Sequence, residues 1–400
     1  MYPPHHLGGY ELSCRDVLDR LRRRGHEVTV LTTTMRVADV TDHPDEQERG
    51  VRRELDFYWD DHRLVTPPLR QRVTIERANH AALRRVIEET RPDVVSVWNM
   101  GAMSLGLLTA VQRRGIPRLL AVCDDWLVYG PRLDAWMRPF ADRPRLGRVA
   151  SAFAGVPATL PDLDRGDVVA CVVSRFTLDR ARKGSRWHLP GAVVVGSGID
   201  TADFPLEPPE SAPRPWRWRV LYVGRLDDRK GIETLIRAVA TLPPETTLSL
   251  VGRGDAAYVE HLRRLAHDAG VADRMTIDAA QRNELAGRYR DADVFVFPSE
   301  WGEPFGLVPL EAMACATPVV ATGVGGSAEF LADGENCLLY PAGDAGALAA
   351  AIQRLAADES LRAALVSGGR ATAVARTTDT LADEFERWHM TAATRRRSVP

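Results

Sequence analysis

PSEWGEPFGLVPLEAMACATPVVAT, residues 298–322, decides the fold because it joins two strands through a loop and a helix. The apolar run DVFVFPS (293–299) leads into it and TPVVAT (317–322) closes it, and both patterns are typical of strands. Between them, Pro309 suits the first turn of a helix and residues 310–316 are mostly good helix formers. The segment therefore predicts strand, irregular loop, helix and strand, the repeating unit of an α/β fold.

Glu303 and Glu311 flank the irregular part of this segment, EPFGLVPLE, and lie eight positions apart. Eight residues is close to two helical turns, so one continuous helix would roughly align the two carboxylates. Pro304, Gly306 and Pro309 disfavour such a helix and instead predict a loop that runs into a helix start. Glu311 then lies in the first helical turn, where a carboxylate is electrostatically favourable.

The backbone between the two glutamates is expected to face an anion. The N–H groups of Phe305, Gly306 and Leu307 precede the helix and are free to point at a ligand, and the glycine permits close approach. Two carboxylates that accept hydrogen bonds from sugar hydroxyls, on either side of such a backbone, would form a cradle for a nucleotide sugar. Taken singly, each has a plainer interpretation: Glu311 as a helix-start carboxylate and Glu303 as a loop charge.

A second stretch, RVLYVGRLDDRKG (219–231), places two cations between the end of a strand and the start of a helix. Arg225 and Lys230 suit a diphosphate at this place, because a helix N-terminus adds unpaired N–H donors and a positive dipole. The alternative is that both are solvated surface charges, with Asp227 and Asp228 as casual partners. A metal-binding role for the adjacent aspartates is disfavoured, because neighbouring side chains diverge.

Composition is that of a globular protein without a polyanionic partner. Four hundred residues predict two domains, and 45% of them are hydrophobic. The net charge of −2 and the absence of a basic stripe interleaved with aromatics argue against nucleic-acid binding. The five cysteines are scattered without metal-ligand spacing, which predicts a reduced, cytoplasmic chain. No apolar run in the sequence is long enough to span a membrane.

Short apolar runs alternate with amphipathic segments along the whole chain, the pattern of an α/β protein. In the first half, strands are expected at 27–33, 93–99, 118–123, 167–174 and 192–198, and helices around 14–21, 73–90 and 103–113. The polar stretch 36–63 is expected to be irregular. In the second half, strands are expected at 219–225, 246–254, 275–279, 293–299, 317–322 and 337–342, with helices between them.

Five prolines between about 200 and 217 disfavour a central strand or helix and predict a linker. The expected organisation is an N-terminal domain (1–199), this linker (200–217), a C-terminal domain (218–375), and a last helix with a basic tail (376–400). Leu381, Phe385 and Trp388 mark the last helix by their spacing. MYPPHHLGGYE at the start looks like the loop that follows a strand, so either the true start lies upstream or the domain lacks a central strand.

Residues 219–375 closely resemble the retaining glycosyltransferases of family 4. Their E-x7-E motif is matched by EPFGLVPLE, their phosphate-binding segment by VGRLDDRKG, and its continuation by VGGSAEFLADGENCLLYPAGD (324–344). The resemblance implies an α/β fold of the GT-B type, with two Rossmann-like domains facing across a cleft and a C-terminal helix that crosses back to the N-terminal domain.

The same resemblance implies roles for the residues singled out above. Arg225 and Lys230 would hold the diphosphate of the donor. Glu303, with the main chain at Phe305, Gly306 and Leu307, would bind the donor sugar. Glu311 would bind the ribose hydroxyls. The base would lie near Arg253 and residues 279–282.

The N-terminal half resembles the family less closely. PPHHLGGYE (3–11) matches its glycine-rich loop, in which Gly8 and Gly9 let the backbone approach the sugar and leaving phosphate; the alternative is a flexible turn. In LLAVCDDWLVYGPR (119–132), Cys123 takes the place of a family histidine, and a cysteine cannot reproduce an imidazole's hydrogen bonds. Asp124 or Asp125 is then expected to take a polar catalytic role, unless the pair only begins a helix.

The activity implied by the resemblance is that of a hexosyltransferase (EC 2.4). A sugar would pass from a UDP- or GDP-sugar to an acceptor hydroxyl with retention, by a front-face internal-return route in which the departing diphosphate helps to deprotonate the acceptor. No metal or other cofactor is expected. Small-molecule, lipid-linked and glycan acceptors all remain open. The Arg395–Arg397 tail is either a weak peripheral contact with membrane lipid or simply solvated.

Two other kinds of function remain open, and two more are disfavoured by the sequence. A non-catalytic nucleotide-sugar-binding protein is suggested by Cys123 and by the missing first strand, and a GT-B epimerase or phosphorylase would share the motifs. A glycosidase is disfavoured, because Glu303 and Glu311 come from one loop and helix start rather than from opposite sides of a substrate. A dinucleotide oxidoreductase is disfavoured because no G-x-G-x-x-G follows a strand.

Overall fold

The structure, a computed structural model, describes residues 1–400 except 7, 38–39, 47, 61–62, 207–214 and 397–400. The chain forms two compact units. Unit 1 contains Met1–Val195 together with Leu381–Pro400, and unit 2 contains Gly196–Thr380. Both units are built on parallel sheets with helices packed against them, which is the α/β class that the alternating pattern predicts.

Unit 2 contains a six-stranded parallel sheet in the order β11-β10-β9-β12-β13-β14. The first strand along the chain, β9, therefore lies inside the sheet between β10 and β12, and the strand order reverses there. This is the arrangement of a doubly wound fold. The strands are β9 (Arg219–Val223), β10 (Thr247–Val251), β11 (Met275–Asp278), β12 (Val294–Phe297), β13 (Val319–Ala321) and β14 (Leu338–Leu339).

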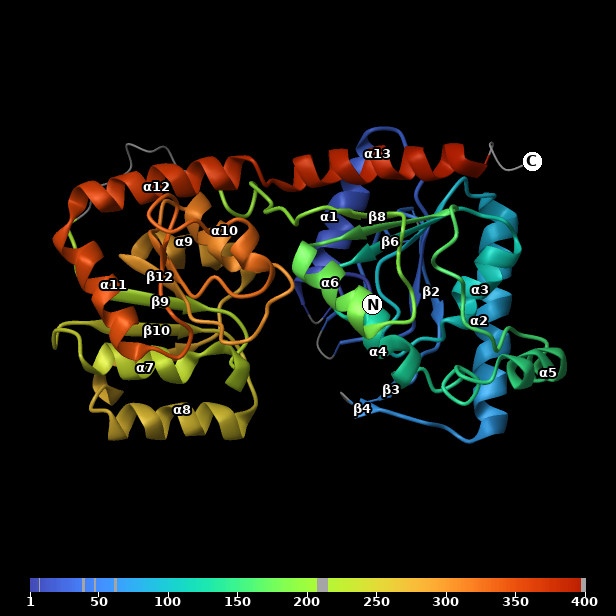
Figure 1. The fold of residues 1–400 in the computed structure, drawn as a ribbon, viewed down its shortest axis with the longest axis horizontal. Coiled ribbons are helices and arrows are strands. Elements are labelled where there is room, and N and C mark those ends of the chain that lie inside the picture. The colour runs from blue at the N-terminus through green and yellow to red at the C-terminus, as the bar shows by residue number, and fades with distance from the viewer. Residues whose placement is uncertain (7, 38–39, 47, 61–62, 207–214, 397–400) are drawn as a thin grey trace. The chain divides into compact units, whose positions relative to one another are not determined.

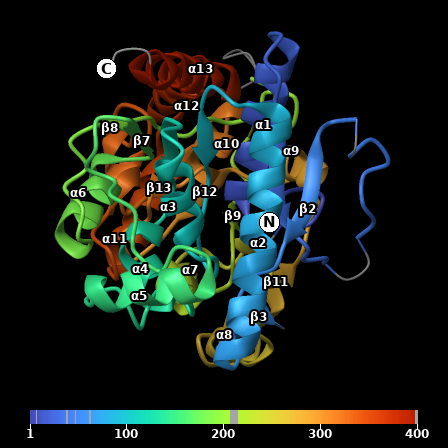
Figure 2. The ribbon, with the colours of Figure 1, turned by 90° about the vertical axis from the view of Figure 1, so that its right-hand side faces the viewer.

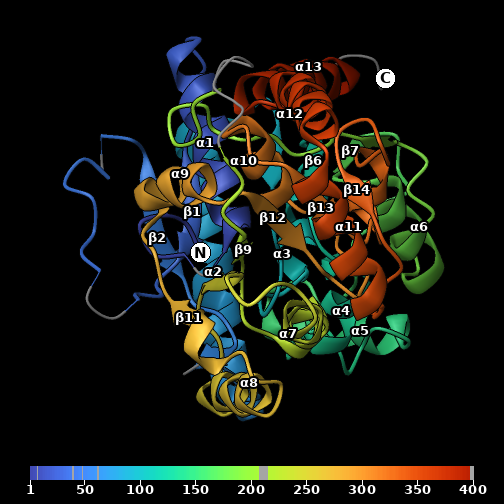
Figure 3. The ribbon, with the colours of Figure 1, turned by 90° about the vertical axis from the view of Figure 1, so that its left-hand side faces the viewer.

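Helices cover both faces of this sheet, with α7 and α8 below it and α9 and α10 above it in Figure 1; Figure 3 shows the same unit from its outer side. Buried Val, Leu and Ile side chains of the strands and of α7 and α11 form one apolar core. The helices are α7 (Ile232–Ala240), α8 (Ala256–Asp268), α9 (Arg282–Asp291), α10 (Val308–Ala314), α11 (Ala345–Ala357) and α12 (Glu359–Val374), with short 3-10 helices η2 (Asp228–Lys230), η3 (Ala272–Arg274) and η4 (Gly326–Glu329).

Unit 1 contains two separate parallel sheets. The larger has the order β5-β6-β7-β8, and the smaller pairs β1 with β2. A short antiparallel pair, β3 (Trp59–Asp60) with β4 (Arg63–Leu64), lies apart from both. The main strands are β1 (Val30–Thr33), β2 (Val51–Leu55), β5 (Val95–Val97), β6 (Arg118–Val122), β7 (Val168–Val172) and β8 (Ala192–Val194).

The helices of unit 1 flank these sheets, and Figure 2 shows α2 beside β2. They are α1 (Gly9–Arg23), α2 (Leu69–Thr90), α3 (Gly106–Arg113), α4 (Trp126–Leu133), α5 (Pro144–Ala154) and α6 (Arg175–Gly184). The expected strands and helices of this half are all present, although most are one to four residues shorter than predicted. Two apolar clusters, one on each side of the sheet layer, form the core.

The prediction that residues 36–63 are irregular is wrong in part. Val51–Leu55 forms β2, which pairs in parallel with β1. Its sequence, VRREL, buries only its two end residues, so it lacks the apolar run by which the other strands are recognised. Hydrogen bonding to β1 and contact with α2 stabilise it in place of its own hydrophobicity.

The last helix, α13 (Thr378–Arg396), confirms the prediction of a C-terminal helix that returns to the N-terminal domain. Leu381 and Phe385 belong to the same apolar cluster as Cys14 and Leu18 of α1. The Phe385 ring stacks on Trp98 with 4.8 Å between ring centroids. The tail position 397 and the Arg395 and Arg396 side chains lie outside the described residues.

Part of the expected linker, residues 207–214, also lies outside the described residues. Of the described part, Phe204 is fully buried and packs edge-on against Tyr289, with 6.1 Å between ring centroids. The segment therefore begins as part of unit 2. Among the helices described here, none is long and apolar enough to cross a membrane.

Candidate active site

The carboxyl ends of β9 and β12 meet at the point in unit 2 where the strand order reverses, and ligands of doubly wound sheets bind at such a point. Glycines, which have no side chain, stand at the ends of the neighbouring strands. Gly224 follows β9 and Gly252 follows β10, and a Cβ on Gly252 would lie 1.8 Å from the carbonyl oxygen of Gly224. Glycine is thus required for these two strand ends to approach one another.

Lys230 ends the 3-10 helix η2, directly before α7. Asp227 caps that helix by accepting from the Arg229 backbone N–H at 3.1 Å and from its Nε at 2.8 Å. Hydrogen bonds from Arg229 hold the pKa of the Asp227 carboxyl well below its usual range. Gly231 follows with a φ of +65°, and a Cβ there would lie 1.9 Å from the Pro298 carbonyl oxygen. This tight turn brings the segment after β9 against the end of β12.

Lys230 and Glu303 form an ion pair across that junction, although 73 residues separate them in sequence. Their side chains are only 16% and 10% exposed. Ser299 Oγ donates to the same Glu303 oxygen, Oε1, at 2.9 Å. Glu303 is therefore a buried carboxylate whose Oε1 is held by Lys230 and Ser299, rather than a solvated loop charge, and Lys230 is likewise not a free surface cation.

The main chain of Glu303 is fixed as firmly as its side chain. Its carbonyl oxygen accepts from the Gly326 N–H at 2.7 Å, and Glu303 forms a parallel bridge with Gly325. A Cβ on Gly325, whose φ is +73°, would lie 2.5 Å from that same carbonyl oxygen. The loop after β12 and the loop after β13 therefore hold one another in position.

The loop from Phe305 to Leu307 presents its backbone without internal partners. Within the described ranges, the N–H groups of Phe305, Gly306 and Leu307 donate to no protein acceptor. Gly306 has a φ of +91°, and a Cβ on it would lie 3.1 Å from the Phe297 ring. A glycine in this conformation between extended or helical neighbours turns successive N–H groups toward one side, which is a geometry that binds anions.

Glu311 lies on the buried face of α10 and is 5% exposed. Tyr289 Oη of α9 donates to its Oε2 at 2.8 Å, and Arg282 Nη1 lies 4.0 Å from its Oε1. Burial raises the pKa of the Glu311 carboxyl, while Arg282 and Tyr289 act in the opposite direction. Glu311 is thus more than a helix-start charge, because two side chains from another helix orient it.

Arg225 is the most exposed of the predicted donor-site residues, with 62% of its side chain accessible. Its Nη2 lies 3.3 Å from Asp227 Oδ2. Arg253 and Ala279 are also exposed, and Arg282 is half-buried, with its guanidinium 5.1 Å from the centre of the Phe204 ring. These residues line the same end of the sheet, at the ends of β9, β10 and β11 and the start of α9.

In unit 1, Gly8 and Gly9 stand at the start of α1, with Gly8 as its N-cap residue. The nearest atom to a Cβ built on Gly8 is Glu11 Oε2 at 3.8 Å, so no crowding within the protein requires glycine there. His5 is fully buried, and its Nε2 lies 2.7 Å from Asp42 Oδ1 while Val37 N–H donates to its Nδ1. His5 therefore helps to fix this loop instead of facing solvent.

Asp124 and Asp125 follow β6 but engage different partners. Asp124 accepts from Tyr129 Oη at 2.8 Å, from the Trp126 N–H at 3.0 Å and from Asn99 Nδ2 at 3.3 Å. Burial raises the pKa of the Asp124 carboxyl, which those hydrogen bonds oppose. Asp125 pairs with Arg180.

Cys123 is buried enough that the pKa of its thiol is raised to about 12, so it stays a neutral thiol near pH 7. Its backbone N–H lies 3.4 Å from Tyr10 Oη, which in turn donates to the Ala121 carbonyl. The thiol therefore supplies neither the charge nor the paired ring nitrogens of a histidine at this position.

Four partners of the predicted residues were not anticipated from the sequence: Ser299, Tyr289, Asn99 and Tyr129. The sequence predicts Ser299 only as the last residue of a strand. The tyrosines occur in helices where an aromatic residue usually means core packing. Only the contacts show that their hydroxyl groups face carboxylates.

A doubly wound sheet whose switch point carries a buried Lys–Glu pair beside an unpaired backbone loop places these residues where Rossmann-like folds bind their ligands. Two family models match the chain: "Glycosyltransferase Family 4" over residues 7–203 and "Glycosyl transferases group 1" over residues 203–372. The chain belongs to glycosyltransferase family 4 and has the GT-B fold class. It is accordingly a sugar-transferring enzyme.

The chain is 33% identical over 306 residues to the GDP-mannose-dependent alpha-(1-6)-phosphatidylinositol monomannoside mannosyltransferase of Mycolicibacterium smegmatis, covering 72% of this chain and 73% of that protein. It is 41% identical over 155 residues to the D-inositol 3-phosphate glycosyltransferase of Xylanimonas cellulosilytica, which is 38% of this chain and about a third (37%) of that protein's length. Among solved structures, sucrose-phosphate synthase from Thermosynechococcus elongatus matches with a TM-score of 0.70 and 26% identity, over 97% of this chain and 94% of that one.

Proposed function

We propose that this enzyme is a retaining glycosyltransferase that moves a hexosyl group from a nucleoside-diphosphate sugar to an acceptor hydroxyl. The observation that carries the proposal is the buried Lys230–Glu303 pair beside the unpaired N–H groups of residues 305–307. A cation, a sugar-binding carboxylate and an anion-binding backbone together match the three parts of such a donor.

In the proposed site, Lys230 and the N–H groups of residues 305–307 neutralise the diphosphate. Arg225, exposed at the end of β9, adds a second cation that can turn from Asp227 to the ligand. Glu303 accepts from hydroxyls of the donor sugar, and Glu311, oriented by Tyr289, accepts from the ribose. A charge distribution of this kind stabilises the leaving group as its bond to the anomeric carbon breaks.

The proposed chemistry follows a front-face route. The bond between the anomeric carbon and the diphosphate oxygen breaks, and the acceptor oxygen bonds to the same face of that carbon. The acceptor proton passes to the departing diphosphate oxygen, so the protein need not supply a general base. Asp124 and Asp125 of unit 1 are proposed to position polar groups of the substrates. Asp124 suits this role because three donors hold its carboxylate in one orientation.

A metal ion is not part of the proposal, because side-chain cations and backbone N–H groups supply the charge that the diphosphate needs. The proposal predicts that transfer is unaffected by EDTA at concentrations that remove free divalent cations. A loss of transfer that added Mg²⁺ or Mn²⁺ restores would require a metal-bound donor instead.

A lipid-linked acceptor is the acceptor class that we propose. The relative from Mycolicibacterium smegmatis is named for a phosphatidylinositol mannoside acceptor and a GDP-mannose donor. In this chain, α5 exposes Leu146, Val149 and Phe153, at spacings of three and four residues, with Phe153 90% exposed. Exposed arginines accompany this apolar stripe and form no ion pair with any described residue: Arg143, Arg145 and Arg148. A short helix with an apolar face and unpaired cations suits an anionic lipid surface.

The test of the proposed function is a transfer assay with the purified chain. GDP- and UDP-sugars are incubated with and without acceptor lipids, soluble polyols and oligosaccharides, and released nucleoside diphosphate is measured. Acceptor-dependent release that Glu303→Ala abolishes, and that the matched surface variant Glu260→Ala leaves intact, supports the proposal. Tight donor binding without release from any acceptor would favour a non-catalytic nucleotide-sugar-binding protein.

A further inference from the structure

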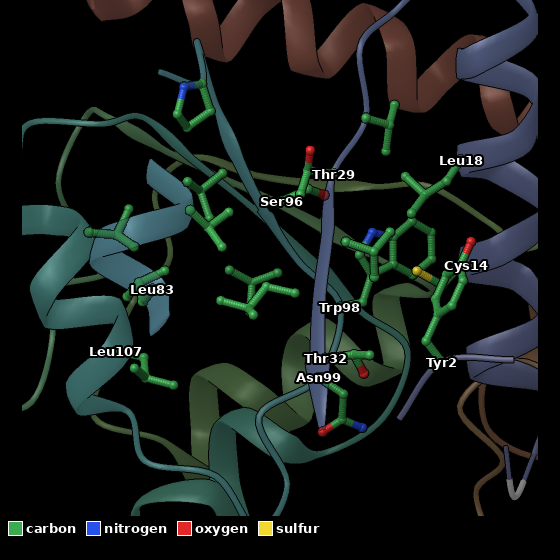
Figure 4. A pocket seen from close by; sticks show the side chains of 18 of the residues that line it. Tyr2, Cys14, Leu18, Thr29, Thr32, Leu83, Ser96, Trp98, Asn99 and Leu107 are labelled. Atoms are coloured by element: carbon green, nitrogen blue, oxygen red, sulfur yellow. The ribbon is translucent and has the colours of Figure 1, made fainter. Parts of the chain in front are cut away.

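A large apolar cavity opens inside unit 1, between the two sheets of that unit. Its volume is about 1210 Å³, whereas well-packed protein interiors contain few voids larger than a water molecule. Strands β1 and β5 and helices α1, α2, α3 and α13 all contribute lining residues, and Figure 4 shows side chains from several of them, among them Thr32, Ser96, Leu18 and Leu83. Apolar side chains from all these elements line it, among them Leu18, Leu31, Leu83, Val95, Val97 and Leu107.

The strands that border the cavity are each paired on one side only. Within the described residues, β1 pairs with β2 and β5 pairs with β6, and neither has a second neighbour. Val30 and Val95 direct their N–H groups to the paired side, where they donate to Gly50 and Pro117 carbonyls. Because successive residues of a strand alternate, the backbone groups of Leu31 and Ser96 face the cavity. Both strands therefore direct unpaired backbone groups away from their partner strands, and residues of both strands line the cavity.

Polar side-chain atoms along the same walls are also without partners. Thr33 Oγ1, Ser96 Oγ and the indole Nε1 of Trp98 are buried and form no hydrogen bond with any described residue. All three residues line the cavity. Similar atoms occur elsewhere among the described residues, so these three show that the cavity wall is not purely apolar but do not identify its occupant.

The cavity has the size of one β-strand. A residue in a strand occupies roughly 160 Å³, from a rise of about 3.3 Å, a strand spacing of about 4.8 Å and a layer thickness of about 10 Å. On that basis 1210 Å³ holds roughly seven to eight residues, enough for a strand of the usual length of about five or six. A strand buried on both faces is expected to be mostly apolar.

We propose that this cavity takes one apolar β-strand, parallel to β1 and β5, formed by residues that precede Met1 in the polypeptide. With it, the two sheets of unit 1 become one continuous parallel sheet in the order β2-β1-new strand-β5-β6-β7-β8. The cavity and its two open strand edges carry the proposal.

Connectivity selects this occupant over others. Met1 and Tyr2 line the cavity and α1 begins at Gly9, so a strand joined to Met1 would run through residues 1–8 into α1 and then β1. That is a β-α-β crossover between neighbouring parallel strands, the commonest way in which such strands are joined. An acyl chain or other apolar ligand would fill the volume but would leave the backbone groups of Leu31 and Ser96 unpaired.

The experiment compares residues 1–400 with the same chain carrying an N-terminal segment of about six alternating valines and isoleucines. One control carries a glycine-serine segment of equal length, and a second carries the apolar segment with a central proline, which removes a strand N–H. Thermal unfolding and hydrogen exchange of peptides that contain Leu31 and Ser96 are measured for all four proteins. The apolar segment is also added as a free peptide, and each protein's oligomeric state is determined by light scattering.

The proposal predicts that the fused apolar segment raises the midpoint of thermal unfolding by on the order of 10 °C. It also predicts that exchange at Leu31 and Ser96 slows by at least about tenfold, while neither control does either. Equal behaviour of the apolar and glycine-serine fusions would overturn it. If the free peptide slows exchange but the fusion does not, the occupant of the cavity is a separate chain. If residues 1–400 form a dimer in which the peptides containing Leu31 and Ser96 are already protected, the occupant is a second copy of this chain. Either result would also overturn the proposal.

Discussion

Neutralising both members of the Lys230–Glu303 pair separates a structural ion pair from a donor site. In Glu303→Gln, the Lys230 ammonium is left largely buried without its counter-charge, and in Lys230→Met the Glu303 carboxylate keeps only Ser299. Breaking a fully buried pair costs about 3–5 kcal/mol. Because these side chains retain 16% and 10% exposure, each single change is expected to cost about 1–3 kcal/mol.

The double variant Lys230→Met/Glu303→Gln leaves no unpaired charge, so its stability is expected to return to within about 1 kcal/mol of the parent. Urea unfolding of the four proteins measures this recovery. Transfer, by contrast, should not recover, because the proposed site needs both charges; kcat/KM should stay at least about a thousandfold below the parent, or about 4 kcal/mol. A stable double variant with more than about a tenth of parental kcat/KM would refute the reasoning, since the pair would then be structural only.

Three further predictions concern single side chains. Tyr289→Phe removes the hydroxyl that orients Glu311 and is expected to raise the donor KM about tenfold with little change in kcat, whereas an unchanged KM would remove Glu311 from the donor site. Burial raises the pKa of the Glu76 carboxyl to about 8. The protonated carboxyl therefore contributes to the free energy of unfolding fully below about pH 4.5, and this contribution falls as the pH rises to 8, by at most about 1.4 kcal/mol per pH unit. Urea unfolding of Glu76→Gln between pH 5 and 8.5 should therefore show a flatter profile than the parent, and parallel profiles would contradict this. Phe153→Ser is expected to weaken binding to anionic vesicles about tenfold or more, measured by flotation, while Val374→Ser, which alters an exposed apolar residue of α12, should not; equal effects would argue against α5 as the lipid contact.

Much of unit 2 could be predicted from the sequence, because its strands are continuous apolar runs and its turns carry diagnostic glycines. Gly231 and Gly306 mark places where a Cβ would collide with the Pro298 carbonyl or approach the Phe297 ring closely. Local chemistry of this kind is visible in a short stretch of sequence. The irregular loop around Gly306 was predicted for the same reason.

Contacts between distant segments were harder to predict. The sequence assigns Lys230 to a diphosphate and Glu303 to a sugar, but not the ion pair between them, because 73 residues and a strand crossover separate the two. Strand β2 was missed because it is stabilised by its neighbour rather than by apolar residues of its own. The contact between His5 and Asp42 was likewise not predictable, because Asp42 lies in a stretch without regular pattern.

The most direct test of the central claim is hydrogen exchange at Phe305, Gly306 and Leu307, whose N–H groups have no acceptor among the described residues of the protein. Exchange is followed by NMR with and without a saturating nucleoside diphosphate or nucleotide sugar, with saturation checked by calorimetry. The account predicts that exchange at these three amides slows by at least about tenfold when the nucleotide binds. Unchanged exchange at all three, in a protein shown to be saturated with nucleotide, would contradict the assignment of this loop to the donor diphosphate.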